Sequence, residues 1–351
     1  MTRTMRAIVV DAPGEPDVMH LRDVPIPEVR PTDVLIRVES CGVCFHDVVT
    51  RNGVMRRGIK MPVIPGHEVS GVVDVLGSEV RSFKIGDRVT TTQRRHICGY
   101  CMFCRSSRET SCKDREFLGD IGLNGGYAEY VAVQEDNVCL IPAGVSFNQA
   151  AITSCAIGTE LNAIRDVGKV RMGEKVLITG AGGGLGIHGI QLARMAGAHV
   201  IAVTSSKEKE KIILDNGAHE VVLIQRGEDF SSAVKELTGG EGVDVVIDNV
   251  GSPTFESTRR SLAMGARWVF VGQVTGEFVK LNPAQLFMRD ISILSAKSTS
   301  SKQLKDALNL VAQGDIRPVI TGEMSLDKAP NAHREVESGR STGRILLKPT
   351  L

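Results

Sequence analysis

A glycine-rich turn between a predicted strand and a predicted helix constrains the fold of this chain more than any other feature. The strand Val176–Thr179 runs directly into this turn, and a helical stretch follows it. Glycines there let backbone N–H groups approach a pyrophosphate, whose negative charge the helix N-terminus favours. The turn therefore predicts a dinucleotide site; the alternative is a purely structural turn. The predicted cofactor-binding positions are Gly180, Gly182, Gly183, Gly184, Leu185 and Gly186, and the pattern has Ala181 in place of its first glycine.

The elements around this turn indicate a parallel sheet. Between residues 155 and 295, β-branched and aliphatic stretches alternate with stretches of helical periodicity. The predicted strands are Lys175–Thr179, Val200–Val203, Val221–Ile224, Val243–Asp248, Trp268–Val271 and Ile291–Leu294. The predicted helices are Leu185–Ala196, Lys207–Asn216, Phe230–Leu237 and Phe255–Met264. Strands that alternate with helices predict a doubly wound α/β domain.

The end of the second predicted strand indicates which dinucleotide is bound. An Asp or Glu about twenty residues after the glycine turn would hold the ribose 2′-hydroxyl of NAD. This chain has Thr204, Ser205, Ser206 and Lys207 there, with no acid before Glu208. Hydroxyls and a lysine suit a 2′-phosphate, so the sequence favours NADP over NAD. The alternative is that the serines only cap the next helix.

The remainder of the chain has a different pattern. Residues 1–154 contain short strands, such as Asp33–Val38 and Val69–Val75, between Gly, Pro and Asp turns. This pattern predicts an antiparallel β domain in the form of a partial barrel. Residues 296–351 hold a predicted helix, Lys302–Gln313, and a predicted strand, Arg344–Leu347, and are too few for a domain. We expect them to return to the first domain.

Four cysteines lie close together in one predicted loop, at Cys98, Cys101, Cys104 and Cys112. Four soft ligands at such short spacings are typical of a closed, tetrahedral structural zinc site. An iron–sulfur cluster is the alternative, and four free thiols are less compatible with this clustering.

Composition limits the partners that this chain is expected to bind. Its 351 residues suit two domains, and the net charge of +1 gives no general attraction to nucleic acid or an anionic membrane. It contains no apolar run of the roughly 18 residues that a membrane span requires, and its first residues lack a signal segment. We therefore expect a cytoplasmic protein that acts on a small molecule.

A second group of potential metal ligands is scattered along the chain. Cys44, His67, Glu68 and Cys155 are each, taken singly, as easily explained as core residues. In combination they resemble the zinc-containing medium-chain alcohol dehydrogenase family over essentially the whole chain. The matching features, in order, are Gly-x-x-Cys44-x-x-Asp47, Gly66-His67-Glu68, the four-cysteine loop, Cys155 before Gly158-Thr159, the glycine turn and Gly343-Arg344.

This resemblance implies a GroES-like partial β-barrel catalytic domain, from 1–154 and 296–351, and a Rossmann cofactor domain, 155–295. It implies that Cys44, His67 and Cys155 bind a catalytic zinc that keeps an open position, and that Glu68 lies behind the metal as an occasional ligand.

The resemblance also implies roles around the metal. Asp47 would orient His67, Thr159 would line the nicotinamide, and Arg344 would meet the cofactor phosphates. Two zinc ions per chain and NADP, or alternatively NAD, are the implied cofactors. The implied reaction is hydride transfer between the nicotinamide and a small alcohol or aldehyde.

The chain departs from the family pattern at His46, where relatives carry a Ser or Thr that relays the alcohol proton. Imidazole titrates near neutral pH, so we expect His46 to take this role; the alternative is that it only packs beside the cofactor. A second departure is positive charge in Arg51–Lys60 and Gln93–His96, which border the substrate entrance in the family. These stretches predict an anionic substrate, such as a carboxylate or a coenzyme A thioester, unless they form ordinary solvated surface.

Two other functions remain open at this point. Phe45–Asp47, Val203–Ser206 and Asp248–Phe255 resemble an acryloyl-CoA reductase branch of the same superfamily, whose enoyl reduction requires no catalytic zinc. A nucleotide-sensing protein without catalysis is the third possibility, which loss of a zinc ligand would support. All three ligands are present, so the alcohol or aldehyde reading is favoured, in a symmetric dimer or tetramer like those of relatives.

Overall fold

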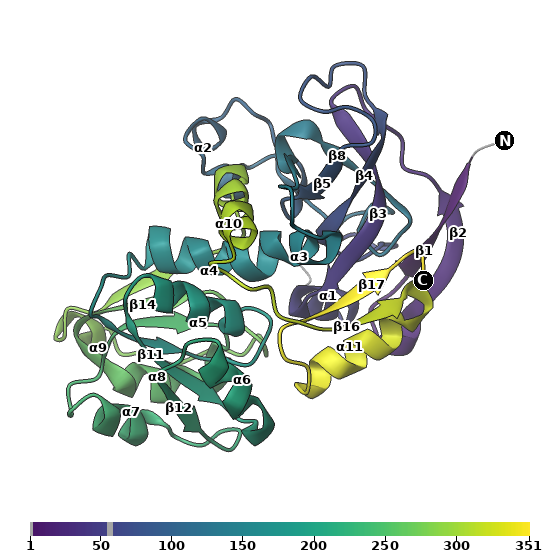
Figure 1. The fold of residues 1–351 in the computed structure, drawn as a ribbon. Helices are drawn as coiled ribbons and strands as arrows, with labels where there is room; N and C mark the ends of the chain where they lie inside the picture. Colours follow the sequence, from purple (N-terminus) through teal and green to yellow (C-terminus); the bar gives the residue numbers. More distant parts are fainter. Residues whose placement is uncertain (1–2, 55–58) are drawn as a thin grey trace. The chain divides into compact units, whose positions relative to one another are not determined.

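The computed structural model describes residues 3–54 and 59–351. The chain divides into two compact units (Figure 1): Met1–Gly158 with Ser298–Leu351, and Thr159–Lys297. These boundaries lie slightly later in the chain than the predicted starts at 155 and 296. Cys155 therefore belongs to the first unit.

A seven-stranded sheet organises the first unit. Its strands run in the order β16-β17-β3-β4-β5-β9, and β8 also pairs with β3. Strands β16 and β17 are parallel to each other, whereas the other pairs are antiparallel. The bounds are β3 Asp33–Val43, β4 Glu68–Leu76, β5 Arg88–Thr91, β8 Tyr130–Gln134, β9 Val138–Leu140, β16 Ile320–Ser325 and β17 Arg344–Lys348. Two smaller sheets pair β1 (Thr4–Val10) with β2 (Met19–Pro25), and β6 (Arg94–His96) with β7 (Glu116–Phe117).

Short helices surround this sheet. They are η1 Pro16–Val18, α1 Phe45–Arg51, α2 Met102–Arg105, η2 Glu109–Ser111, η3 Glu135–Asn137, α3 Phe147–Ile152, the π-helix η4 Thr153–Ile157, α10 Ser301–Gln313, η8 Leu326–Lys328 and α11 Ala329–Ser338. Helix α10 begins at a Ser300 cap and ends at Gly314, whose φ of 81° no β-carbon-bearing residue adopts easily. The sequence analysis missed β16 and α11, both of which are short and mostly polar.

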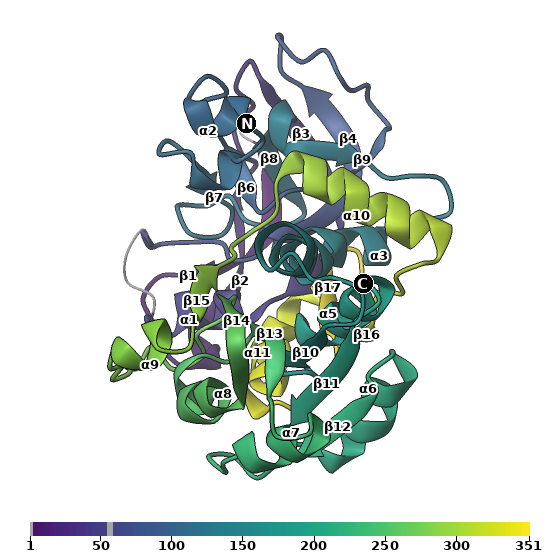
Figure 2. The same cartoon turned by 90° about the vertical axis from the view of Figure 1, so that its left-hand side faces the viewer.

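The second unit is a six-stranded parallel sheet in the order β12-β11-β10-β13-β14-β15 (Figure 2). Its strands are β10 Lys175–Ile178, β11 His199–Thr204, β12 Glu220–Leu223, β13 Val243–Asp248, β14 Leu262–Phe270 and β15 Ser292–Ser295. Its helices are α4 Gly158–Leu161 at the boundary, η5 Asn162–Val167, α5 Gly186–Met195, η6 Lys207–Lys209, α6 Glu210–Asp215, α7 Ser231–Leu237, η7 Ser252–Thr254, α8 Phe255–Ser261 and α9 Ala284–Phe287. The predicted fold class, a GroES-like domain with a Rossmann domain, is confirmed.

One predicted helix is too long. Phe255–Met264 was expected to be helical throughout, but α8 ends at Ser261 and Leu262 pairs with Val243 of the neighbouring strand. The apolar residues of this segment fit either a helix or a buried strand, and pairing with β13 decides between them.

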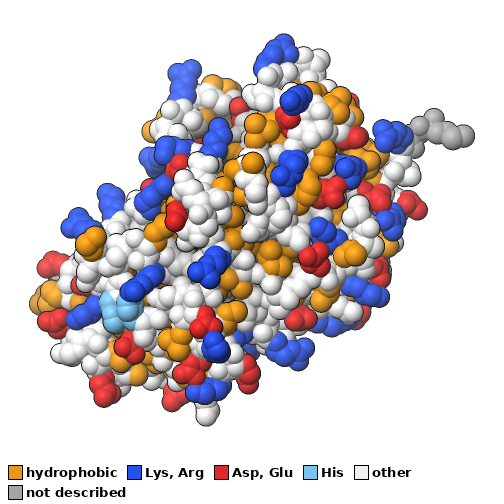
Figure 3. All heavy atoms as spheres, viewed as in Figure 1, with side chains coloured by type: hydrophobic (Ala, Val, Ile, Leu, Met, Phe, Trp, Pro, Cys, Tyr) orange, Lys and Arg blue, Asp and Glu red, His pale blue; other side chains and the backbone are white. Residues whose placement is uncertain are grey.

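The described helices offer none with the length and apolar character of a membrane span. On the face drawn in Figure 3, Lys and Arg side chains are interspersed with Asp and Glu among the described residues. That face therefore carries no continuous patch of one sign.

Candidate metal centre and cofactor site

Four side chains that are distant in sequence meet in the first unit. One ligand atom from each of Cys44, His67, Glu68 and Cys155 lies within 4.8 Å of every other, and all four residues are buried. The structure therefore brings together the complete predicted catalytic ligand set.

Strand ends and backbone turns position these ligands. Cys44 follows β3 and caps α1, His67 directly precedes β4, and Cys155 lies in the π-helix η4. Gly66 has a φ of +99°, which lets the chain turn sharply before His67. Each ligand is thus fixed by a different element of one unit.

Glu68 occupies space that a glycine on the neighbouring strand leaves open. Gly42 of β3 pairs with Glu68 of β4, and a β-carbon on Gly42 would come within 2.2 Å of Glu68 Oε2. Arg344 Nε donates to Glu68 Oε1 at 2.9 Å, and Arg344 Nη2 lies 3.4 Å from Cys44 Sγ. Burial raises the pKa of Glu68 to about 7, although Arg344 opposes this rise.

Arg344 was predicted to meet the cofactor phosphates. Within the first unit, its guanidinium is buried against Glu68 and the thiols of Cys44 and Cys155. Its positive charge compensates the negative charge of Glu68 behind the ligand set. The phosphate role stays a prediction.

Asp47 holds His67 as predicted from the resemblance. Asp47 Oδ1 lies 3.1 Å from His67 Nδ1, which leaves Nε2 for a metal. Asp47 also accepts hydrogen bonds from the backbone N–H groups of Cys44 and Gly66. Burial on its own would raise the pKa of Asp47, but the charge and hydrogen bond of His67 hold it well below its usual range.

His46 lies beside this ligand set. Its ring packs edge-on against His67, with centroids 5.2 Å apart, and Phe117 contacts both rings. His46 Nε2 lies 2.9 Å from Asp120 Oδ1, so Asp120 fixes the orientation of the ring. Sequence reasoning missed Asp120, because no motif links it to His46.

The second predicted ligand set, Cys98, Cys101, Cys104 and Cys112, also comes together. The Sγ–Sγ distances are 3.9 Å for Cys98–Cys104, 3.6 Å for Cys101–Cys104 and 3.6 Å for Cys98–Cys112. Three of these cysteines are partly exposed, and Cys112 is buried.

The sulfur spacing fits zinc at both clusters. Tetrahedral coordination with Zn–S bonds of about 2.3 Å places two sulfurs about 3.8 Å apart. Three sulfur pairs of the four-cysteine cluster lie 3.6–3.9 Å apart, and Cys44 Sγ lies 3.9 Å from Cys155 Sγ. A disulfide would require about 2.05 Å. Both donor sets thus suit a metal ion.

In the second unit the glycine turn has the shape required to approach a pyrophosphate. Gly180 has a φ of +62°, and Gly183 N donates to Gly180 O at 2.9 Å. A β-carbon at Gly186 would come within 2.5 Å of Gly180 O, so only glycine fits where the turn enters α5. Gly182, Gly184 and Leu185 complete the turn. Thr159 is buried at the start of this unit.

After β11, the lysine that lies against the glycine turn is Lys209, whereas the sequence analysis had named Lys207. Lys207 extends outward to an ion pair with Glu210, whereas Lys209 is buried with its Nζ 3.4 Å from Gly182 O. Lys209 thus lies against the turn itself. Its place in the short helix η6, two residues further on than expected, carries no sequence signal.

Ser206 does not form the helix cap that was the alternative to a phosphate-binding role. Ser206 precedes η6 but makes no side-chain cap bond, and its hydroxyl donates to Glu208 instead. Thr204 Oγ1 accepts from Ser206 N, and Ser205 is exposed. The capping alternative is therefore not supported for Ser206.

The predicted basic entrance is wrong for two of its arginines. Arg51 is buried and bonds to Gly14 O and Glu337, and Arg94 is buried against Ser298 and Thr299. Their charges are satisfied inside the fold and attract no substrate. Arg56 and Arg57 lie outside the described residues.

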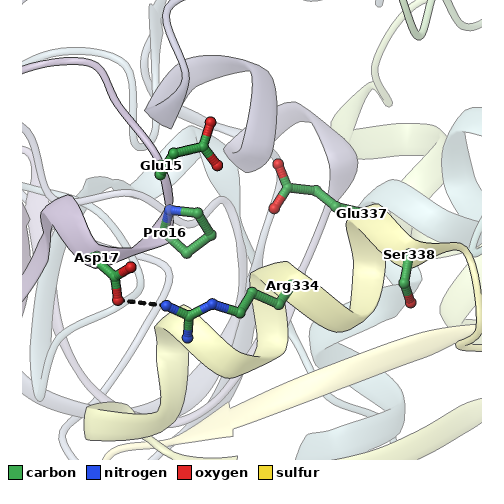
Figure 4. A pocket seen from close by; sticks show the side chains of 6 residues that line it. All are labelled: Glu15, Pro16, Asp17, Arg334, Glu337 and Ser338. Carbon is green, nitrogen blue, oxygen red and sulfur yellow. Dashed lines mark hydrogen bonds and ion pairs between the residues drawn. The ribbon is translucent and has the colours of Figure 1, made fainter.

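The first unit also has a surface hollow between η1 and α11 (Figure 4), and none of the predicted metal ligands lines it. Glu15, Pro16, Asp17, Arg334, Glu337 and Ser338 line it.

The fold and the site together are those of a two-domain dehydrogenase/reductase. A protein-family model described as an alcohol dehydrogenase GroES-like domain matches residues 30–143. A second family model, described as a zinc-binding dehydrogenase, matches residues 184–313. The chain belongs to the medium-chain dehydrogenase/reductase superfamily, as the sequence resemblance predicted, and is an oxidoreductase.

Relatives with different names match the whole chain. An acryloyl-coenzyme A reductase of Sulfurisphaera tokodaii is 35% identical over 98% of this chain and 100% of its own length. The crystal structure of AibC is 41% identical, with a TM-score of 0.90 over 99% of this chain and 96% of that one. A structure of an NAD-dependent alcohol dehydrogenase is 34% identical, with a TM-score of 0.92 over 98% of this chain and 99% of that one.

Proposed function

We propose that this chain is a zinc-dependent oxidoreductase that exchanges a hydride between NADP(H) and a small alcohol or aldehyde. The observation that carries the proposal is the convergence of Cys44, His67 and Cys155 within 4.8 Å of one another, with a thiol spacing that suits zinc. Two buried thiols and an imidazole brought together in this way are a donor set typical of a catalytic zinc site.

The proposed roles follow from the contacts. Cys44, His67 and Cys155 hold the ion, which supplies a Lewis acid for the substrate oxygen. Asp47 fixes the His67 ring, and Glu68 with Arg344 forms a neutral, buried pair behind the ligands. His46, oriented by Asp120, accepts the hydroxyl proton during alcohol oxidation and returns it during carbonyl reduction.

The second unit supplies the dinucleotide site in this proposal. The turn Gly180–Gly186 binds the pyrophosphate, and Lys209, beside Gly182, binds the 2′-phosphate together with the hydroxyls of Thr204 and Ser205. The nicotinamide, near Thr159, supplies the hydride acceptor and donor.

Lys209→Met tests the cofactor assignment. A charged hydrogen bond contributes about 1.5–3 kcal/mol, so we expect KM for NADPH to rise about 10- to 100-fold while KM for NADH hardly changes. Lys207→Met, which removes an exposed lysine two residues away, is the matched control. An equal effect of Lys209→Met on both cofactors would contradict the assignment.

Enoyl thioester reduction is a second candidate, because an acryloyl-coenzyme A reductase matches 98% of this chain. The two candidates share the fold and the cofactor but differ in whether the metal is required.

A spectrophotometric screen distinguishes them. NADPH oxidation is followed with short aldehydes, semialdehydes and enoyl-CoA thioesters, before and after metal removal. We expect turnover with an aldehyde that disappears on chelation and returns with Zn²⁺. Oxidation with thioesters only, unaffected by chelation, would overturn the first proposal in favour of the second.

A further inference from the structure

A buried row of hydrogen bonds continues from the metal ligands to the C-terminal helix of the first unit. Tyr127 Oη lies 3.1 Å from Asp47 Oδ2, and His333 Nε2 lies 3.2 Å from Tyr127 Oη. Asp47 in turn contacts His67. Tyr127 and His333 are each 0% exposed, so water does not compete for these bonds.

The direction of each bond follows from the chemistry of the groups. An ionised carboxylate only accepts, so the Tyr127 hydroxyl donates its single proton to Asp47. The Tyr127 oxygen is then left to accept from His333, which requires the proton of the neutral imidazole to sit on Nε2. His333 Nδ1 has no hydrogen-bond partner among the described residues, as expected of an unprotonated nitrogen in a dry environment. Burial lowers the pKa of His333 to about 4, which keeps the ring neutral at pH 7.

Packing holds Tyr127 close to the ligand loop. A β-carbon on Gly66 would come within 2.5 Å of the Tyr127 ring, so the glycine before His67 makes room for this side chain. The backbone N–H of Gly66 donates to Asp47 as well. Asp47 thus receives four donors: Cys44 N, Gly66 N, His67 Nδ1 and Tyr127 Oη.

Helix α11, which carries His333, is itself anchored to the β domain. Arg334 pairs with Asp17 across the hollow in Figure 4, and the buried Arg51 pairs with Glu337. On the helix, Arg334 and Glu337 both follow His333, and their ion pairs connect α11 to η1 and to α1.

We propose that Tyr127 and His333 are positioning residues of the metal centre: they hold Asp47, and through it the His67 ring, in the orientation that retains the ion. This inference rests on the proposed metal site. The stabilising effect arises because a carboxylate fixed by several donors cannot rotate away from the imidazole that it orients.

The test measures metal release rather than turnover alone. Wild type and variants are loaded with zinc and mixed with excess chromophoric chelator, and the release of each ion is timed. Loss of a hydrogen-bonding partner outside the ligands costs about 10- to 100-fold in metal affinity. Tyr127 lies one hydrogen bond beyond Asp47, and His333 lies two beyond it. For Tyr127→Phe and His333→Leu we therefore expect about 3- to 10-fold faster release from the site of Cys44, His67 and Cys155 (the mixed site), scaled down from that range.

Three comparisons separate a loss of His67 positioning from a general destabilisation of the protein. Release from the four-cysteine site is expected to stay unchanged in every variant. His333→Gln, whose side-chain amide can still donate a hydrogen bond toward Tyr127 Oη, is expected to release zinc at close to the wild-type rate. Arg334→Gln, which removes an ion pair on the same helix without touching the row, is expected to lower stability slightly and leave release unchanged. Cobalt-loaded protein gives a second readout, since a reoriented imidazole changes the visible ligand-field spectrum.

The outcomes are distinguishable. Wild-type release rates and spectra in both Tyr127→Phe and His333→Leu would overturn this inference and leave the proposed function intact. Equal acceleration at both metal sites would also overturn it, as a sign of general destabilisation. Metal only at the four-cysteine site of the wild type would overturn both proposals together.

Discussion

The two metal-ligand clusters of this chain differ in what holds them together. Cys98, Cys101, Cys104 and Cys112 lie within one short segment, and most of them are partly exposed. The mixed set draws Cys44, His67, Glu68 and Cys155 from three separate elements, and every member is buried. The first cluster requires only its own loop, whereas the second exists only when β3, β4 and η4 have assembled. Metal binding at the mixed site therefore reports the tertiary fold.

The environments differ as well. The mixed set includes one imidazole and one carboxylate, and Arg344 lies against the carboxylate and both thiols. The four-cysteine set contains thiols alone. Four thiolates close a coordination sphere, whereas two thiolates and an imidazole leave a place for substrate.

The largest expected effect comes from removing a ligand of the mixed site. Cys155→Ala should lower kcat by more than the 10- to 100-fold that loss of an outer hydrogen-bonding partner causes, because the ion itself is lost. Zinc content should fall from two ions to one, with the circular dichroism unchanged. Cys139→Ala, a change of another buried cysteine outside both clusters, is the control. Unchanged turnover in Cys155→Ala would show that this site has no catalytic role.

A change at the four-cysteine cluster should lower the stability of the fold and leave turnover intact. The double variant Cys98→Ser/Cys101→Ser should lose one zinc and unfold roughly 5–10 °C lower, since loss of a few kcal/mol shifts Tm by about 2–4 °C per kcal/mol in domains of about 150–250 residues. Turnover per folded molecule below that transition should be retained. Loss of turnover at full zinc occupancy of the mixed site would contradict the division into catalytic and structural ions.

Chelation should separate the two sites in time. The mixed site offers three strong ligands, and the other offers four thiolates, so a chelator should remove the mixed-site ion first. Activity should fall in step with the first equivalent released, while near-ultraviolet circular dichroism persists. Activity that survives this first equivalent would reverse the assignment.

The smallest effect concerns Glu160, a buried acid beside which the described residues place no cation. Burial raises the pKa of Glu160, in the second unit, to about 7, although the Asn249 side chain opposes the rise, and neither oxygen makes a hydrogen bond of normal geometry to the described residues. The unfolded pKa is near 4.5, so ionisation destabilises the fold progressively between pH 4.5 and 7 and fully above pH 7.

Glu160→Gln should therefore increase the free energy of unfolding at pH 8 by up to about 3 kcal/mol and change it little at pH 4. Denaturant unfolding at the two pH values measures this, with the exposed Glu236→Gln as control. A gain of equal size at both pH values would show that the effect is not due to charge.

The sequence predicted the parts of this account that depend on spacing and residue type. Six strands alternating with helices, the glycine turn and the four-cysteine loop are local patterns, and resemblance joined Cys44, His67 and Cys155. The predictions failed where tertiary contacts decide. Arg51 and Arg94 resemble surface charges until Glu337 and Thr299 satisfy them inside the fold. Lys209, Asp120, Tyr127 and His333 acquire their importance only from neighbours that are distant along the chain.

Anomalous diffraction at the zinc absorption edge, on crystals of the zinc-loaded protein, tests the central claim most directly. The account predicts two peaks per chain, one among the four cysteines and one bonded to Cys44, His67 and Cys155. A single peak at the four cysteines, in crystals of protein that is active, would contradict it.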